Sequence, residues 1–398
     1  MSLDYSYAID EEVEENPEIL LALSKLSTRV AREISRRAET LAKLREEIRS
    51  RLEIRKSEDT GSSRFLSILA VDSTWSTPPL DLVAGSIAFI ATGYVIAAPS
   101  GLGAHGISRV AARLGLGEVE GRFKLSIELD SKIMEYLTAH EMLNESVDMV
   151  MLDGSLYFSS MHDFYNPAPP TTDRRMLAGA ELASLVSRAL LDLMYKADEL
   201  QAPLVGVVKR VSSKLLLPKI SDIIGLKEPA YVNDKLLASI ILEPGEYMIL
   251  ENYLEAHRKY LELAAASQGK NAWRLLKTIE YCTSLPENTP QGSLCNRMKK
   301  TAIAFYRHKG PTGYPQATRL DIYPANRAEE IIEYAMKHTT ENNVPEPIDH
   351  VDRYVRIDTA TIKRLYQILR SISPTPESLI ALNLTNPQKR YLYEEKTG

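Results

Sequence analysis

The stretch Ile68-Leu69-Ala70-Val71-Asp72-Ser73-Thr74 is an apolar run that ends in an aspartate, and Met149-Val150-Met151-Leu152-Asp153-Gly154-Ser155 repeats the pattern. Each run predicts a buried β-strand whose final aspartate emerges at the rim of a sheet. Two such carboxylates on neighbouring strands would repel each other strongly unless a cation lay between them. The pair Asp72 and Asp153 therefore predicts a metal site.

The composition is typical of a globular protein. The chain has 398 residues, of which 44% are hydrophobic and 25% charged, enough for one large core or two smaller ones. A net charge of −5 excludes a uniformly basic coat for nucleic acid, but it leaves room for a local basic groove. With Cys282 and Cys295 as its only cysteines, we expect neither a disulfide framework nor a multi-thiolate zinc site, which fits a reducing cytosol and a cytoplasmic protein.

The segment from Leu82 to Ser108 carries no Asp, Glu, Lys or Arg and would be long enough to span a membrane. Glycines and Pro99 interrupt it, and many of its apolar residues are β-branched or aromatic. This pattern favours buried strands joined by a glycine-rich turn, with no membrane association. The acidic N-terminus also gives no sign of a signal peptide.

A helix start is expected at Asn16-Pro17-Glu18, and apolar residues then recur at the helical period to about Arg55. The pattern predicts one amphipathic helix of roughly 35–40 residues, longer than most globular helices. Such a helix packs either across a subunit or along its own domain. We therefore expect residues 1–63 to form an acidic segment and this helix, residues 64–358 the main domain with a helical insertion at about 215–305, and residues 359–398 a C-terminal helix and tail.

Several further elements follow from periodicity and from turn residues. They are consecutive strands from the first run to about Ala98, a helix over Asp130–Asn144, a helix over Arg175–Ala197, a strand over Ala202–Val208, a strand over Arg319–Tyr323 followed by a helix to about Lys337, and a helix over Thr359–Ser371. Helices and loops are expected over about Leu215–Phe305.

The order of acids along these elements predicts the fold class. Strand-end Asp72 is followed by two further strands, by Glu135 on a helix and by strand-end Asp153. This is the layout of RNase H-like nucleases, in which the first and fourth strands lie side by side and a helical acid leans over the same sheet edge. We expect an α/β fold with a mixed sheet flanked by helices. Its converging carboxylates would bind Mg²⁺ or Mn²⁺, and two such ions about 4 Å apart can hydrolyse a phosphodiester.

The chain resembles the NurA nucleases, archaeal enzymes that process DNA ends. The resemblance rests on the order of short motifs from about Phe65 to Asp358: Val71-Asp72-Ser73, Leu152-Asp153-Gly154-Ser155-Leu156, Val207-Val208-Lys209-Arg210, Asn233-Asp234-Lys235-Leu236-Leu237, Glu243-Pro244-Gly245-Glu246 and Pro345-Glu346-Pro347 before Val351-Asp352. It implies a Mn²⁺- or Mg²⁺-dependent single-strand endonuclease and 5′→3′ exonuclease. It also implies a homodimer that docks on a hexameric HerA-type translocase and resects double-strand breaks.

The resemblance also implies roles for individual residues. Asp72 and Asp153 match metal ligands, while Glu135 matches the helical glutamate and Asp352 the late acid of the family. Two of these assignments stay open, and their alternatives are Glu128 and Glu141 for the helical acid and Asp349 and His350 for the late position.

Other residues have simpler expected roles. Lys209 and Arg210 follow a predicted strand and would hold phosphate, and His350 is a further candidate for contact with nucleic acid. Asp234 is expected to cap the helix that follows it, and Trp75 is expected in the core rather than on a base-stacking surface.

Other enzyme classes lack their signatures. The sequence contains no P-loop, so ATP use would have to come from a partner, and it contains no Gly-x-Ser-x-Gly elbow. The expected reaction is hydrolysis of DNA to 5′-phosphate and 3′-hydroxyl ends. The main alternative is a clamp that binds DNA on the same fold without cleaving it; a coiled-coil assembly factor built on the N-terminal helix would leave both strand-end aspartates unexplained.

Overall fold

The computed structural model describes residues 17–57, 65–98, 101–115, 120–157, 174–209, 211, 213–224, 232–268, 270–310, 316–373 and 375–386. Its strands are β1 (Ile54–Lys56), β2 (Ile68–Trp75), β3 (Leu80–Leu82), β4 (Gly85–Ala98), β5 (Gly101–Gly115), β6 (Met149–Asp153), β7 (Leu204–Val208), β8 (Glu246–Asn252), β9 (Ala302–Tyr306) and β10 (Thr318–Tyr323). Its helices are α1 (Pro17–Lys43), α2 (Arg45–Arg49), α3 (Glu120–Met142), α5 (Arg174–Glu199), α6 (Leu217–Ile224), α7 (Asp234–Ile241), α8 (Tyr253–Gln268), α9 (Lys270–Ser284), α10 (Pro290–Lys299), the short 3₁₀ helix η2 (Ala325–Arg327), α11 (Ala328–Lys337), α12 (Glu346–Tyr354), α13 (Thr359–Ser371) and α14 (Pro376–Ala381).

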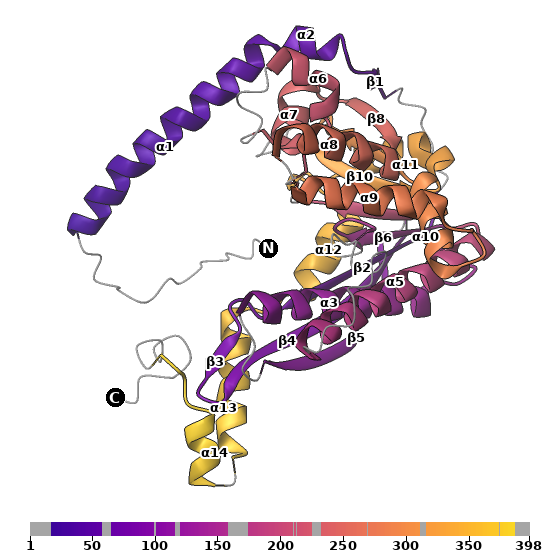
Figure 1. The fold of residues 1–398 in the computed structure, drawn as a ribbon. Helices are drawn as coiled ribbons and strands as arrows, with labels where there is room; N and C mark the ends of the chain where they lie inside the picture. The colour runs from indigo at the N-terminus through magenta and orange to yellow at the C-terminus, as the bar shows by residue number, and fades with distance from the viewer. Residues whose placement is uncertain are drawn as a thin grey trace.

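One mixed sheet of ten strands organises the molecule. Its order is β1-β8-β9-β10-β7-β6-β2-β4-β3, and β5 pairs with the other edge of β4. At its centre β2, β6 and β7 run parallel, whereas the other described pairs are antiparallel. This arrangement confirms the predicted α/β class and the expectation that the strands carrying Asp72 and Asp153 are neighbours (Figure 1).

Helices cover both faces of the sheet, and the alternation of side chains along β2 shows how. Leu69 and Val71 join a core cluster with α3, α5 and α10. Ile68 and Ala70 point the other way, into a cluster with α11 and α12. Because successive side chains of a strand face opposite sides, Asp72 belongs to the face covered by α12, and Ser73 to the face covered by α3.

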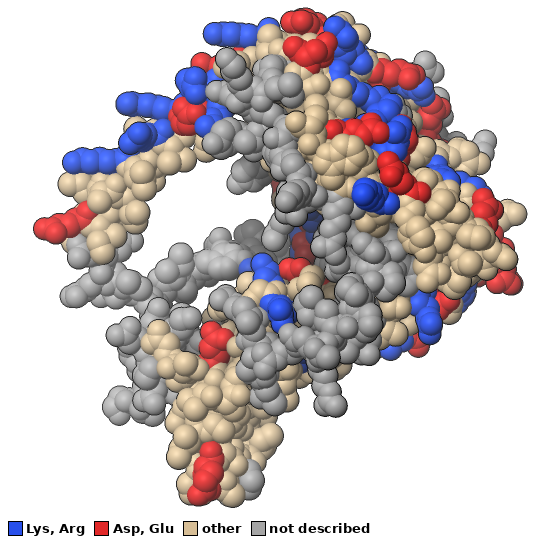
Figure 2. All heavy atoms as spheres, viewed as in Figure 1, with Lys and Arg blue, Asp and Glu red and all other residues tan. Residues whose placement is uncertain are grey.

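The N-terminal helix differs from the prediction. It ends at Lys43, and the short helix α2 follows in place of a continuation to Arg55. The break lets Ile48 pack into the core beside α6 and α7, while Arg49 donates to Ile241 O at 2.6 Å and to Glu246. Apart from its end near Leu41, α1 extends away from the rest of the molecule (Figure 1). Lys and Arg side chains lie along it (Figure 2).

The uncharged segment forms β4 and the first part of β5, with residues 99 and 100 outside the described part of the chain. The expectation of buried strands is correct for the centre of β4 but wrong for β5, which is mostly exposed. The reason is its place at the sheet edge, where β4 is its only strand partner among the described residues. Within the described residues, none of the helices combines the length and the apolarity that a bilayer crossing needs.

Two other expectations need correction. Cys282 and Cys295 form a disulfide between α9 and α10, with Cα atoms 5.7 Å apart. The contact between these two helices brings the cysteines together, which the sequence alone did not reveal. The region 215–305, expected to hold helices and loops, also contains β8 and β9. Both strands are short, with seven and five residues, so local periodicity marks them poorly.

Candidate metal centre

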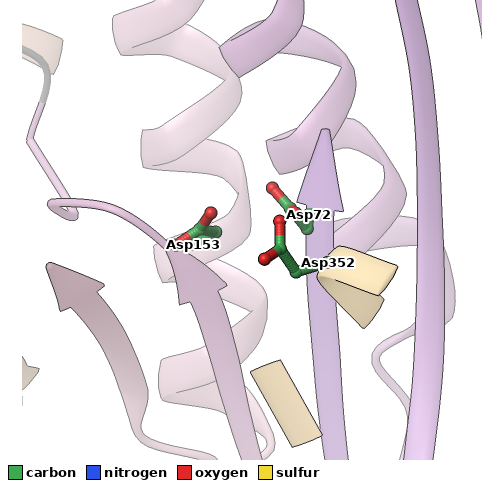
Figure 3. A group of neighbouring side chains, drawn as sticks. All are labelled: Asp72, Asp153 and Asp352. Carbon is green, nitrogen blue, oxygen red and sulfur yellow. The ribbon is translucent and has the colours of Figure 1, made fainter. Parts of the chain in front are cut away.

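Three carboxylates converge where β6 ends beside β2. Oxygen atoms of Asp72, Asp153 and Asp352 all lie within 4.8 Å of one another, and the side chains point toward a common centre (Figure 3). Val71 pairs with Leu152 in the parallel register, so the next residues on the two strands, Asp72 and Asp153, are neighbours. The two predicted aspartates therefore lie close together, as expected, but only Asp153 ends its strand, because β2 continues past Asp72 to Trp75.

Asp352 arrives from α12, which lies close against the sheet. Val351 and Val355 are buried there, and Gly93 on β4, the register partner of Asp72, makes the close approach possible. A Cβ atom at Gly93 would lie 2.6 Å from Val355 Cγ1 and 2.9 Å from the Gly106 carbonyl oxygen. The absence of a side chain at Gly93 therefore lets α12 pack where Asp352 lies close to Asp72 and Asp153.

Lys209 lies between two of the carboxylates. It follows β7, the strand next to β6, and its Nζ is 3.1 Å from Asp153 Oδ2 and 3.1 Å from Asp352 Oδ2. Burial opposes the charged ammonium, but Asp153, Asp72 and Asp352 outweigh it and raise the pKa of Lys209. Lys209 is therefore a cation that already compensates part of the negative charge of the cluster.

The electrostatics of Asp72 fit a divalent cation. Its side chain is buried, and burial, followed by the charges of Asp153 and Glu135, raises the pKa of Asp72 well above its usual value. Mg²⁺ and Mn²⁺ prefer oxygen ligands such as carboxylates. A divalent cation would also offset the repulsion between these carboxylates, which disfavours their ionisation. The residues present therefore suit such an ion, with Asp72, Asp153 and Asp352 as the donors.

Glu135 lies beside this group rather than within it. It is buried on α3, where Lys132 Nζ contacts its carboxylate oxygens at 2.8 and 2.9 Å and Ser73 Oγ donates to it at 3.2 Å. Burial raises the pKa of Glu135 to about 7 although Lys132 opposes this. Because α3 covers the opposite face of the sheet from α12, Glu135 approaches the strand ends from the other side, and its predicted role as a metal ligand stays a prediction.

The alternative residues for the helical acid and for the late acid contact other partners. Glu141 pairs with Arg109 at 2.8 Å, and Glu128 lines the cleft within 4.0 Å of Lys124. On α12, Asp349 is buried against Asn342 and Arg353.

His350 lies 3.4 Å from Glu346 on the same helix. Consecutive helical residues point in different directions. Of the three candidates on α12, Asp352 is the one that lies with Asp72 and Asp153 in the carboxylate group found among the described residues. Arg210 lies outside the described residues.

Lys132 is a residue of this site that the sequence analysis missed. Besides Glu135, it donates to the carbonyl oxygen of Asp153. The available signal was its position three residues before Glu135 on the same helix, where the two side chains are neighbours. Gly154 has a φ of +90°, a backbone conformation that glycine adopts without strain, so glycine serves the turn after Asp153.

The acids lie in the wall of a cleft of about 930 Å³. The cleft is also lined by α8 and α9, through His257, Tyr260, Leu261 and Leu275. Trp75 lines it too while packing beside Ala88, Ile90 and Phe123, so the expected core role is only part of its environment. A cavity of this size is in the range that encloses whole organic ligands, so it has room for more than a phosphate group.

Asp234 does not cap α7 as expected. Asn233 is the cap, accepting from Leu236 N at 2.8 Å. Asp234 instead accepts from Leu215 N at 2.7 Å and from Leu216 N at 2.9 Å, and so fixes the loop that follows β7. The sequence placed the polar pair at a helix start but could not show which member faces the helix.

Comparison with known proteins agrees with the fold. The sequence model of the NurA domain matches residues 66–357. The structure is similar to the NurA nuclease from Sulfolobus solfataricus, with a TM-score of 0.54 and 11% identity over 89% of this chain and 96% of that one. It is also similar to a NurA structure bound to dAMP and manganese, with a TM-score of 0.50 and 11% identity over 91% of this chain and 99% of that one. No curated protein sequence matches significantly. Because the family match spans most of the chain, from the strand that carries Asp72 past the helix that carries Asp352, the protein belongs to the NurA family.

Proposed function

We propose that this protein is a metal-dependent deoxyribonuclease that hydrolyses phosphodiester bonds of DNA. The observation that carries the proposal is the convergence of Asp72, Asp153 and Asp352 beside Lys209 in the wall of a large cleft. Family membership supports the same chemistry, and the relative solved with dAMP and manganese supports a nucleotide and a manganese ion as the matching ligands.

The chain's own residues would divide the work as follows. Asp72, Asp153 and Asp352 would hold Mn²⁺ or Mg²⁺, with Glu135 available beside them for a second ion. Bound ions of this kind supply activation of water and stabilisation of the leaving oxygen. Lys209, released from the carboxylates when a cation neutralises them, would hold a phosphate oxygen, and Arg210 and His350 would extend that contact along DNA. Hydrolysis would leave a 5′-phosphate and a 3′-hydroxyl.

The finer assignment includes single-strand endonuclease and 5′→3′ exonuclease activity in the resection of double-strand breaks. The protein would act as a cytoplasmic homodimer on a hexameric HerA-type translocase, which would supply the ATPase activity. Support for an intermolecular contact comes from α1, whose apolar residues Leu23, Leu26, Val30 and Ile34 are each about half exposed or more.

The test is cleavage of labelled single-stranded DNA with Mn²⁺ and with EDTA, by the wild type and by Asp72→Asn. The wild type should shorten DNA only with the metal, and Asp72→Asn should lose more than about 100-fold of the rate, the upper end of what loss of a merely supporting residue costs at a metal site. Asp222→Asn is the matched control, because Asp222 is exposed and pairs with Arg51 on the surface. It should cleave like the wild type.

Cleavage by Asp72→Asn at the control rate would contradict the assignment. If the wild type binds DNA with Mn²⁺ present but yields no products, the protein is a non-catalytic clamp instead.

A further inference from the structure

A partly buried polar contact links the acidic cluster to β10, two strands away from β6. Ser155, two residues after Asp153, donates its hydroxyl to Asp321 Oδ2. Asp321 is completely buried in the middle of a strand whose neighbouring residues Leu320 and Ile322 are core residues. Aspartate is depleted in strand interiors, so this carboxylate calls for a specific reason.

The path from Asp153 to Asp321 crosses β7 at a glycine. Gly206 is the register partner of Asp321. A Cβ atom at Gly206 would lie 2.6 Å from Leu156 N and 2.7 Å from the Gly154 carbonyl oxygen. The turn after Asp153 therefore lies directly on the backbone of β7, and this close approach allows the Ser155 hydroxyl to reach the next strand.

Asp321 is itself held in a single orientation. Its other oxygen accepts from Arg319 Nε at 2.9 Å, and this arginine is also buried. Arg319 in turn donates to Ser213 Oγ at 3.1 Å, and Ser213 donates to Asp234 at 2.6 Å. A buried carboxylate that is paired and hydrogen-bonded on both oxygens is a rigid acceptor.

We propose that Ser155 and Asp321 are positioning residues for the metal centre, with Asp321 fixing the Ser155 hydroxyl and thereby the turn that aims the Asp153 carboxylate at Asp72 and Asp352. Groups that orient a ligand through hydrogen bonds tune metal affinity without touching the ion. The catalytic consequence rests on the proposed nuclease function, whereas the consequence for ion binding does not.

The first test compares Ser155→Ala with Ser187→Ala. Ser187 is a buried serine of α5, and among the described residues its hydroxyl bonds to Ala183 O of the same helix at 3.1 Å. We expect Ser155→Ala to bind Mn²⁺ about 10- to 100-fold more weakly in a calorimetric titration without DNA. At saturating Mn²⁺ its kcat should fall while the KM for DNA stays within about threefold of the wild type, and Ser187→Ala should change neither affinity nor kcat.

The second test isolates the acceptor at position 321. Two double variants both carry Arg319→Met, and they differ only in Asp321→Asn or Asp321→Leu. In each, the buried positive charge of Arg319 and the negative charge of Asp321 are removed together. Asparagine and leucine have similar shapes, but only asparagine offers Ser155 an oxygen. The asparagine variant should bind Mn²⁺ at least about tenfold more tightly than the leucine variant.

Equal Mn²⁺ affinity of Ser155→Ala and the wild type would overturn the inference, as would equal affinity of the two double variants. If the wild type binds Mn²⁺ but cleaves no DNA, the nuclease proposal fails. The affinity comparisons still test whether Ser155 and Asp321 position the metal centre. A wild type that binds no Mn²⁺ would overturn both.

Discussion

At the scale of single residues, the buried charge of Asp72 governs the site. Burial and the neighbouring carboxylates raise the pKa of Asp72 above its value of about 3.9 in an unfolded chain. A group of this kind contributes stability that is present below the unfolded pKa and is lost as the pH rises through the folded pKa. Without a metal ion, the raised pKa of Asp72 therefore lowers the stability of the fold as the pH rises.

Replacing Asp72 by Asn should consequently stabilise the metal-free protein. We expect a gain of roughly 1–3 kcal/mol in the free energy of unfolding at pH 8, the usual cost of a buried polar group without adequate partners, and a smaller gain at pH 5. Melting temperatures in EDTA at both pH values measure it. Added Mn²⁺ should raise the melting temperature of the wild type but not that of the variant. A wild type as stable as Asp72→Asn at pH 8 in EDTA would contradict this electrostatic account.

The residues of the site differ in how far their sequence reveals them. Asp72 and Asp153 each end an apolar run, so local pattern alone marks both; it places Asp153 correctly at a strand end, whereas β2 continues past Asp72 to Trp75. Asp352 could not be separated from Asp349 and His350, because the choice depends on which face of α12 meets the sheet. Asp321 was missed although an acid inside an apolar strand was a visible signal, since its partners Ser155 and Arg319 are defined only by the register of β7 and β10.

At the scale of elements, the contact between α12 and β4 sets the position of Asp352. Gly93→Ala should push α12 outward, since the new methyl would meet Val355 and a backbone oxygen. We expect a loss of about 1–3 kcal/mol in unfolding free energy, as for other overpacked sites, together with weaker Mn²⁺ binding. Urea titration and calorimetry measure the two effects.

A second substitution and a control sharpen that experiment. Val355→Ala in the Gly93→Ala background should recover part of the Mn²⁺ affinity but not all, because the clash with the Gly106 carbonyl oxygen remains. Gly121→Ala on α3 is the control, since a Cβ there meets nothing within 4 Å, and it should leave Mn²⁺ affinity unchanged. Unaltered Mn²⁺ binding by Gly93→Ala would show that α12 does not need this close approach.

Local sequence patterns predicted the presence of helices and strands better than the residues at which they begin and end. The helix over Thr359–Ser371 was predicted with the bounds of α13, where Asp358 caps it by accepting from Thr361 N. The break after Lys43 was not predicted because the periodic pattern continues, and the packing of Ile48 decides it. The exposure of β5 was also hidden, since an edge strand and a central strand can share one composition. The division of the chain at residues 63 and 358 stays a prediction.

At the scale of the whole molecule, α1 is the feature that a single copy of the chain leaves unexplained. Its first five turns expose an apolar stripe, but Leu41 and Ile48 further on belong to the core. A truncation meant to test self-association should therefore end before Leu41. Removal of residues 1–36 should lower the mass measured by light scattering from that of a dimer to that of a monomer.

A substitution in the full-length chain controls for the loss of residues. Leu26→Glu with Val30→Glu places charges in the exposed stripe of α1 and should have the same effect on mass, because a buried unpaired charge opposes association. Cleavage of DNA by the resulting monomer would show that the site is complete in one chain. An unchanged mass of both variants would contradict a role of α1 in self-association.

The central claim is that Asp72, Asp153 and Asp352 share a divalent ion. Anomalous diffraction from a crystal of the wild type soaked in Mn²⁺ tests it most directly. The account predicts a manganese peak at bonding distance, about 2.0–2.3 Å, from an oxygen of each of the three side chains, with Lys209 displaced from at least one carboxylate. Manganese found elsewhere, or no peak between the three aspartates at saturating Mn²⁺, would contradict it.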